Sequence, residues 1–208
     1  MQNYSMAREE LRFLKKLNSP EKIQDYLDTL SYNYSNPYMC KSPGRLLRLP
    51  ENERTAHCLE GSLLAAAAQR LNEQTPFLLE LVALNDDFHF IAPFQRNGLF
   101  GAMSYSRTYA LKWRDPIFKS VRELALSYFP VFVRNGNLSL RMYSNPVDIS
   151  CFDYMDWMNT DNCLEELGNK FDDFLHFNLF DESIQIRQVD DELEHLLIKE
   201  KPPIDFGK

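Results

Sequence analysis

The stretch TAHCLEGSLLAAAAQRL at residues 55–71 is followed by FLLELVAL (77–84), FHFIAPF (88–94) and LFGAMSY (99–105). The first segment is apolar and rich in alanine, which favours a helix that packs closely on other elements. The other three segments have the length and composition of buried strands. Asn97-Gly98 separates the last two and is a strong signal for a tight hairpin. The sequence therefore predicts a helix followed by three strands, of which the last two are antiparallel.

The segments on either side predict further helices. Two amphipathic helices are expected first, at residues 6–17 and from Ser19-Pro20 onward, where serine caps and proline occupies the first turn. Another helix is expected to begin at Asp115-Pro116, and a strand is expected at residues 138–144. Acidic helices are expected from about residue 153 to residue 200, and the tail KPPIDFGK (201–208) is expected to be loose.

Together these elements predict an α+β fold. A small antiparallel sheet packs on the helix that carries Cys58, and N- and C-terminal helices wrap around both. Residues 1–150 are expected to form this α+β domain with two N-terminal helices. Residues 151–208 are expected to form a C-terminal helical extension packed on the same domain.

Composition excludes several classes of function. The chain has 208 residues, with 23 Lys and Arg against 30 Asp and Glu, so its net charge is −7. An acidic chain is a poor partner for nucleic acid and for anionic membranes. Apolar runs stay well short of the roughly 20 residues of a membrane span, and the N-terminus lacks the apolar region of a signal peptide.

The cysteine pattern favours free thiols. The chain has four cysteines without CxxC spacing, at positions 40, 58, 151 and 163. With no visible export signal, we expect them to be reduced and the protein to be cytoplasmic. An oxidising location, with one of three possible pairings, remains the alternative.

Cys58 and His89 are the residues that could perform chemistry. Cys58 is expected in the first turn of a helix, where free N–H groups and the helix dipole favour a thiolate. His89 is expected in an apolar strand beside that helix. This arrangement predicts a nucleophilic thiolate–imidazolium pair. Each residue alone is more often structural, as a buried thiol or a core histidine.

A third group should orient the imidazole. Ser104, on the partner strand of the hairpin, is the first candidate because its side chain could reach the ring. Asp87 is a possible supporting residue because it precedes His89 by two positions and would share its strand face. Glu60 is expected to be a capping or solvent-exposed carboxylate, with a role in the cleft as the alternative.

A cysteine that opens an apolar helix, then a strand, then a histidine at the start of a strand and a glycine-containing hairpin resembles the transglutaminase-like core of papain-like cysteine enzymes. The resemblance covers residues 54–106, about a quarter of the chain. The flanking stretches WRDPIFKSVRELALSYF and LRMYSNPVD are similar to bacterial proteins that share this core. In that family the order is Cys, His, Asp, and this chain has Ser104 where the aspartate would stand. A serine can fix a tautomer but cannot supply the stabilising anion.

The resemblance implies thiol-dependent acyl transfer or amide hydrolysis. The substrate would be a peptide, a protein or a small amide, and no cofactor is required. The alternative is a binding module that retains the fold and holds a peptide or protein in the cleft or on the tyrosine-rich loop, residues 32–38. A metal site built from His57, Cys58 and His89 is disfavoured, because adjacent helical ligands diverge by about 100°.

The remaining candidates are interpreted as structural. His57 is expected to point away from the site. His176 and His195 are expected to be exposed on acidic helices, and Trp113 and Trp157 to be packing residues. The chain has only 7 glycines, so a glycine-rich nucleotide loop is disfavoured.

Overall fold

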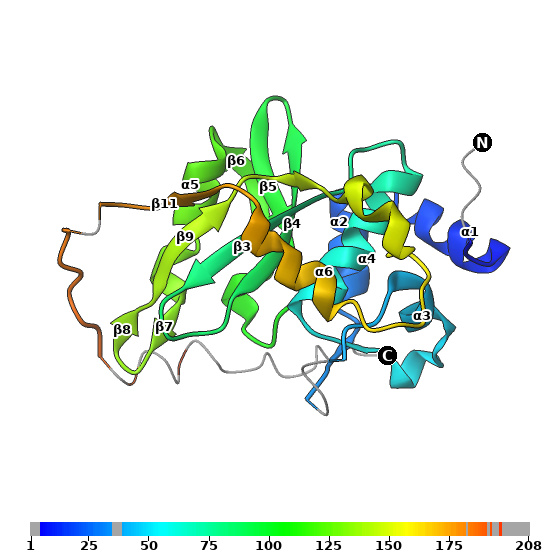
Figure 1. Cartoon of the computed structure of the whole chain (residues 1–208), viewed down its shortest axis with the longest axis horizontal. Coiled ribbons are helices and arrows are strands. Elements are labelled where there is room, and N and C mark those ends of the chain that lie inside the picture. The colour runs from blue at the N-terminus through cyan, green and yellow to red at the C-terminus, as the bar shows by residue number, and fades with distance from the viewer. Residues whose placement is uncertain (1–4, 35–38, 182, 191, 193–195, 197–208) are drawn as a thin grey trace, which may run out of the picture.

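The computed structural model describes residues 5–34, 39–181, 183–190, 192 and 196 (Figure 1). The helices, in chain order, are α1 Arg8–Lys16, α2 Pro20–Leu27, α3 Pro43–Arg48, α4 Cys58–Leu71, α5 Val121–Leu126 and α6 Glu165–Asn169. The strands, in chain order, are β1 Ser31–Tyr32, β2 Thr55–Ala56, β3 Phe77–Ala83, β4 His89–Arg96, β5 Leu99–Met103, β6 Arg114–Phe118, β7 Val133–Arg134, β8 Asn137–Leu138, β9 Leu140–Ser144, β10 Val147–Asp148 and β11 His176–Asn178. Short 3-10 helices lie at Glu51–Glu53, Tyr109–Leu111, Phe129–Val131, Ile149–Met155 and Lys170–Asp173.

The fold is α+β, built on one antiparallel sheet. Six strands follow the order β11-β9-β3-β4-β5-β6, and β10 pairs with β3 at the side of this path. The helices α1 to α4 and α6 lie toward one end of the molecule, and the hairpin β7–β8 lies toward the other (Figure 1). With seven strands, the sheet is larger than the sequence predicts.

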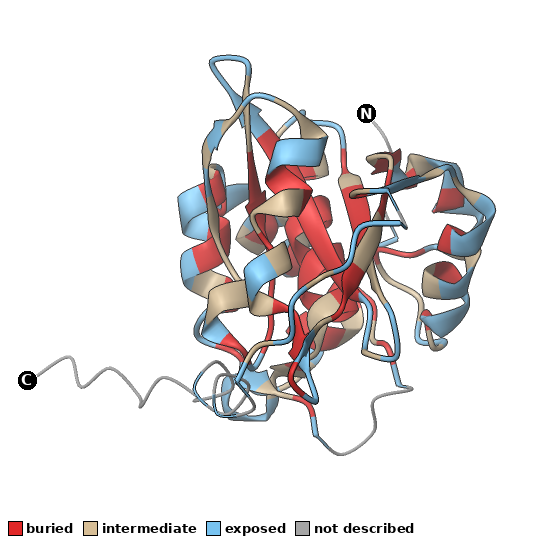
Figure 2. Cartoon of the chain, turned by 90° about the vertical axis from the view of Figure 1, so that its left-hand side faces the viewer, coloured by how far each residue is buried: buried red, intermediate tan, exposed pale blue. Residues whose placement is uncertain are grey.

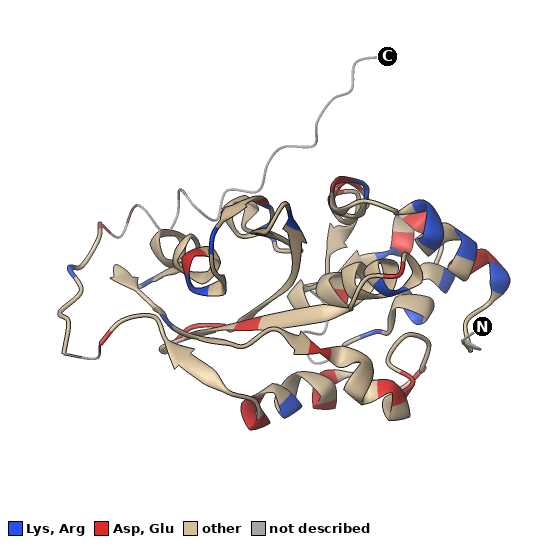
Figure 3. Cartoon of the chain, turned by 90° about the horizontal axis from the view of Figure 1, so that it is seen from above, with Lys and Arg blue, Asp and Glu red and all other residues tan. Residues whose placement is uncertain are grey.

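Both faces of the sheet are covered. Side chains alternate along β4, so that Phe90 and Ala92 pack with α4 whereas Ile91 packs with Leu124 of α5. In Figure 2 the buried residues follow the strands and α4 through the middle of the molecule. In Figure 3, acidic and basic residues are interspersed over the outer helices. The C-terminal region contributes Leu167 to the same core as α4.

The predicted hairpin is confirmed. Asn97 and Gly98 have φ values of 52° and 78°, the left-handed conformations that a two-residue turn of type I′ requires. Strand β4 pairs with β5 in the register Ala92↔Met103, and β3 pairs with β4 on the other side. This register sets Ser104 diagonally across from His89.

The helix expected at Asp115-Pro116 is wrong. Residues Arg114–Phe118 form the edge strand β6, on which exposed and partly buried residues alternate. An edge strand tolerates Pro116 because one of its sides needs no ladder N–H. The helix begins later, at Val121, where the Ser120 hydroxyl accepts from the Glu123 N–H at 3.1 Å.

The C-terminal half is less helical than predicted. After α6 and a 3-10 turn, the chain continues as strand β11, which pairs with β9. His176 is therefore not exposed on a helix: its Nε2 lies 3.1 Å from Oε2 of the buried Glu80. Packing of aromatic residues 171, 174 and 177 on the sheet side overrides the helical pattern. Most of the acidic segment 189–200, including His195, and the tail 201–208 lie outside the described residues.

Candidate functional site

Helix α4 begins at Cys58, and not at Thr55 as predicted. Thr55 and Ala56 form strand β2, which pairs in parallel with β1. The N-cap is His57, whose backbone N–H donates to Oε2 of Glu60 at 2.8 Å. Cys58 is therefore the first helical residue, where unpaired N–H groups concentrate.

Glu60 is a capping carboxylate, but a buried one. Its side chain has no exposed surface, and Oε1 accepts from the Lys41 backbone N–H at 2.9 Å and from Lys41 Nζ at 2.6 Å. The carboxylate thereby fastens the chain around Lys41 to the start of α4. The Lys41 contact could not be predicted from local pattern, because Lys41 and Glu60 lie 19 residues apart in the chain.

The Cys58 sulfur lies in a mixed environment. The side chain is half-buried. Burial raises the pKa of its thiol to about 11, although backbone N–H groups of Phe90 and Leu59 lower it and the charge of Asp87 raises it further. At neutral pH the group is therefore a thiol. This differs from the predicted resting thiolate, because desolvation outweighs the favourable N–H groups.

His89 is held at one ring nitrogen. Its Nε2 lies 3.2 Å from the Ser104 hydroxyl and 3.2 Å from the Leu111 carbonyl oxygen. The Ser104 hydroxyl donates its single proton to Leu111 O at 2.6 Å or to Lys112 O at 2.7 Å, so toward the ring it can only accept. Both neighbours of Nε2 are thus acceptors. Nε2 carries the proton in the neutral ring, and Nδ1 keeps a free lone pair.

The imidazole is neutral at physiological pH. Burial lowers the pKa of His89 to about 4, the Leu111 carbonyl opposes this shift, and the charge of Arg114 adds to it. The ring also lies edge-on or tilted toward the aromatic rings of Tyr128 and Phe132, at centroid distances of 6.3 and 6.4 Å. The predicted imidazolium is therefore not the resting form.

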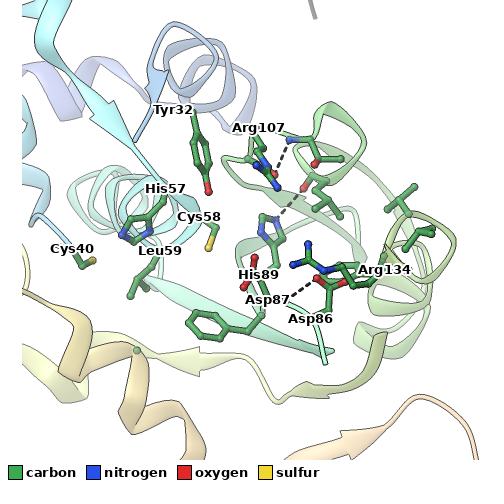
Figure 4. A pocket seen from close by; sticks show the side chains of 18 of the residues that line it. Tyr32, Cys40, His57, Cys58, Leu59, Asp86, Asp87, His89, Arg107 and Arg134 are labelled. Carbon is green, nitrogen blue, oxygen red and sulfur yellow. Dashed lines mark hydrogen bonds between the residues drawn. The ribbon is translucent and has the colours of Figure 1, made fainter. Parts of the chain in front are cut away.

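Cys58 and His89 line the same cavity of about 540 Å³. Figure 4 shows the Cys58 sulfur and the His89 ring on neighbouring walls of this cavity. No hydrogen bond joins the two side chains in the described part of the chain. One wall comes from the α4 and α6 side and contributes His57, Leu59 and Gly168; the other comes from the segments around residues 106–111 and 131–134.

Asp87 does not support His89 as expected. It lies in the turn before β4, since that strand begins at His89, so the two residues do not share a strand face. Asp87 lines the cavity instead, and its charge acts on Cys58. Its neighbour Asp86 accepts from the Ser139 hydroxyl at 2.6 Å.

Several residues of the site were missed or misplaced. The Leu111 carbonyl carries no side-chain signal, so the sequence could not reveal it. His57 was expected to point away, yet it lines the cavity. Its buried Nε2 has no hydrogen-bond partner among the described residues and lies 3.6 Å from Oε2 of Glu60. Tyr32 and Arg107 line the cavity as well. Only Tyr32 belonged to a segment singled out in the sequence, the tyrosine-rich loop.

The cysteines form no disulfide with one another in the described part of the chain. Cys40 is buried, and burial raises the pKa of its thiol well above the usual value. Within the described residues, no cluster of three or more His, Cys, Asp or Glu side chains could hold a metal ion. Trp157 is fully buried, and Trp113 packs on Phe94.

The chain was compared with known proteins by sequence. No protein-family model and no curated protein matches it. Across the described residues, no helix has the length and apolar character needed to cross a membrane.

Proposed function

We propose that this chain is a thiol-dependent enzyme of the transglutaminase-like type, which transfers or hydrolyses an acyl group carried by a peptide, a protein or a small amide. Cys58 is the nucleophile and His89 is its general base. One observation carries the proposal: both groups that touch Nε2 of His89 are acceptors, which leaves the lone pair of Nδ1 for the proton of a nucleophile at the same cavity.

The pKa values select one form of the mechanism. Because the pKa of the Cys58 thiol is about 11 and the pKa of the His89 imidazole is about 4, both groups are neutral at rest. Cys58 therefore loses its proton during attack, directly to Nδ1 or through one water molecule. The new C–S bond forms as the carbonyl electron pair moves to oxygen, and the backbone N–H groups at the start of α4 stabilise that oxyanion.

The second half of the reaction returns the proton. His89, now protonated, gives its proton to the leaving amine or alcohol as the C–N or C–O bond breaks, and an acyl thioester remains on Cys58. Water or an amine then attacks the thioester carbonyl, with His89 accepting its proton; the C–S bond breaks, the acid or new amide leaves, and His89 returns the proton to the Cys58 sulfur. Ser104 fixes the ring but supplies no negative charge, so we expect a slower enzyme than one with an aspartate at that position.

The test is acylation by an activated ester. p-Nitrophenyl acetate should acetylate Cys58, seen as a thioester on the Cys58 peptide by mass spectrometry, and wild type should turn over the ester. Cys58→Ala should abolish the acyl adduct and the turnover, and His89→Gln should reduce turnover at least 100-fold. Cys151→Ala, which removes an exposed thiol, is the matched control and should behave as wild type. Labelling of all accessible cysteines alike, unchanged in His89→Gln, would contradict the proposal.

The second candidate is a binding module that keeps the fold without catalysis. The neutral Cys58 and His89, with no hydrogen bond between them in the described structure, favour it. In that case the cavity holds a peptide or protein segment. A Cys58→Ala variant that binds an identified partner as tightly as wild type, in a protein inert toward acyl substrates, would support this function over the first.

A further inference from the structure

Tyr32 is held beside the beginning of α4 by a short parallel ladder. Strand β1 pairs with β2 in the register Tyr32↔Ala56, and the Asn33 N–H donates to the Ala56 carbonyl at 2.9 Å. Ala56 precedes Cys58 by two residues. The backbone around Tyr32 is therefore fixed relative to the nucleophile, although 26 residues separate the two in the chain.

The ring of Tyr32 is fixed as well. It stacks on Tyr105 at a centroid distance of 6.2 Å, and the Tyr105 hydroxyl donates to the Leu30 carbonyl at 2.7 Å. Tyr105 in turn packs directly on α4 at Gly61, where an added Cβ would meet the Tyr105 Cβ at 2.4 Å. Tyr32 is thus supported from behind by a buried aromatic residue that contacts the same helix as Cys58.

The hydroxyl of Tyr32 faces the reacting sulfur. Both residues line the cavity, and in Figure 4 the phenol oxygen points toward the Cys58 side chain. Burial raises the pKa of the Tyr32 phenol, and the next largest cause is the charge of Cys58. The phenol is therefore an intact O–H donor at neutral pH, beside the sulfur that would attack a carbonyl.

The backbone N–H groups near the Cys58 sulfur already have acceptors, so a side-chain donor for the oxyanion would be useful. Those of Phe90, Leu59 and Cys58 are directed at the sulfur itself, and that of His57 is bound to Glu60. A rigid phenol at the cavity wall adds a side-chain donor to these backbone N–H groups.

We propose that the Tyr32 hydroxyl is a further oxyanion donor, acting on the carbonyl oxygen of the bound acyl group beside the backbone N–H groups at the start of α4. As the C–S bond forms, the carbonyl electron pair moves to oxygen and Tyr32 donates a hydrogen bond without losing its proton. When the intermediate collapses, the pair returns and the bond to the leaving group breaks. This inference rests on the proposed acyl chemistry of Cys58.

The test uses Tyr32→Phe, which keeps the stacked ring and removes only the hydroxyl. Tyr34→Phe is the matched control: its ring contacts Tyr32 at 4.9 Å but does not line the cavity. With p-nitrophenyl acetate, Tyr32→Phe should lower kcat about 10- to 100-fold with little change in KM. The rate at which iodoacetamide alkylates Cys58 should stay within about twofold of wild type, because the sulfur displaces iodide and no oxyanion forms.

A second measurement requires no turnover. The aldehyde N-acetyl-phenylalaninal adds reversibly to a thiol, and the hydroxyl of the resulting thiohemiacetal occupies the position of the oxyanion. It should protect Cys58 from iodoacetamide, with about tenfold weaker protection in Tyr32→Phe and unchanged protection in Tyr34→Phe.

The outcomes separate the two proposals. Equal protection in wild type and Tyr32→Phe, or no protection of wild type, overturns the role of Tyr32. Tyrosine-dependent protection in a protein that turns over no ester supports the donor role of Tyr32 and contradicts the enzymatic function. If Tyr32→Phe lowers the alkylation rate of Cys58 and its protection by the aldehyde to the same extent, Tyr32 has a merely structural role, and this result also overturns the inference.

Discussion

The Ser104 hydroxyl lies 2.6 Å from the Leu111 carbonyl oxygen, which itself lies 3.2 Å from Nε2 of His89. A second carbonyl, that of Lys112, lies 2.7 Å from the same hydroxyl. Ser104 is fully buried, so water cannot mediate these contacts from outside. A backbone carbonyl thus holds the imidazole here, with serine as the link between ring and backbone. An anion in place of the serine would face two carbonyl oxygens.

We therefore expect Ser104→Asp to harm the protein and not to restore a Cys-His-Asp triad. A buried carboxylate against two acceptors should lower the free energy of unfolding by about 3 kcal/mol. Ser104→Ala leaves the Leu111 carbonyl as acceptor for Nε2 and should cost about 1 kcal/mol. Urea denaturation measures both. Higher stability or higher esterase activity in Ser104→Asp than in wild type would refute this account.

The pH dependence of Cys58 alkylation tests whether Cys58 and His89 are both neutral at rest. Because the pKa of Cys58 is raised to about 11, only a small fraction is thiolate at pH 7. The rate of iodoacetamide labelling at Cys58 should rise about tenfold per pH unit from pH 7 to 10, without a plateau. Peptide mass spectrometry across this range gives the profile. A plateau that starts near pH 7 would instead identify the thiolate–imidazolium pair that the sequence predicts.

The same pKa values set the pH range of the proposed activity. Turnover needs His89 unprotonated, which holds above about pH 4, and Cys58 protonated at rest, which holds below about pH 11. We expect kcat/KM for p-nitrophenyl acetate, corrected for spontaneous hydrolysis, to be nearly flat between pH 6 and 9. A steep rise with a midpoint near pH 6.5 would show an imidazole with an ordinary pKa and would contradict the buried, neutral His89.

We expect the buried carboxylate of Glu60, at the start of α4, to contribute more to the free energy of unfolding than solvent-exposed carboxylates do. Glu60 neutralises Lys41, whose side chain is 13% exposed. Glu60→Gln should lower the free energy of unfolding by about 3 kcal/mol, because it leaves a largely buried ammonium without a counter-charge. The control is Glu166→Gln, which breaks a solvent-exposed pair with Lys170 and should leave the free energy of unfolding nearly unchanged, because water screens such a pair. Chemical denaturation of both variants should give clearly unequal losses; equal losses would refute the structural role of Glu60.

The sequence was sufficient to predict features that depend on neighbouring residues, such as the turn between β4 and β5. Asn97-Gly98 dictates its turn because both residues adopt positive φ, and that turn fixes the β4–β5 register. The register in turn brings Ser104 within 3.2 Å of His89. The proline signal failed at Pro116, because the same residue pattern suits an edge strand, and pairing with β5 is a tertiary effect.

The electrostatic state of the site could not be predicted in this way. The helix start and the neighbouring imidazole favour a thiolate, but the surrounding atoms that desolvate Cys58 and His89 come from many segments. Tyr32 reaches the site through a two-residue parallel ladder too short to leave a pattern in the sequence. The Leu111 carbonyl is a backbone group. What the sequence cannot encode locally is the balance between desolvation and hydrogen bonding.

His89 should also make the fold sensitive to acid. Its pKa is lowered from 6.5 to about 4, so between these values the unfolded chain binds a proton that the folded chain excludes. The stability from a neutral His89 is complete above pH 6.5 and is lost as pH falls through 4, by about 3 kcal/mol in all. His89→Gln keeps a donor for the Leu111 carbonyl but cannot titrate. Urea denaturation at pH 7 and pH 4 should therefore show wild type losing about 3 kcal/mol more than this variant. Equal losses would mean that His89 titrates alike in the folded and unfolded chains, which is incompatible with its burial against Tyr128 and Phe132.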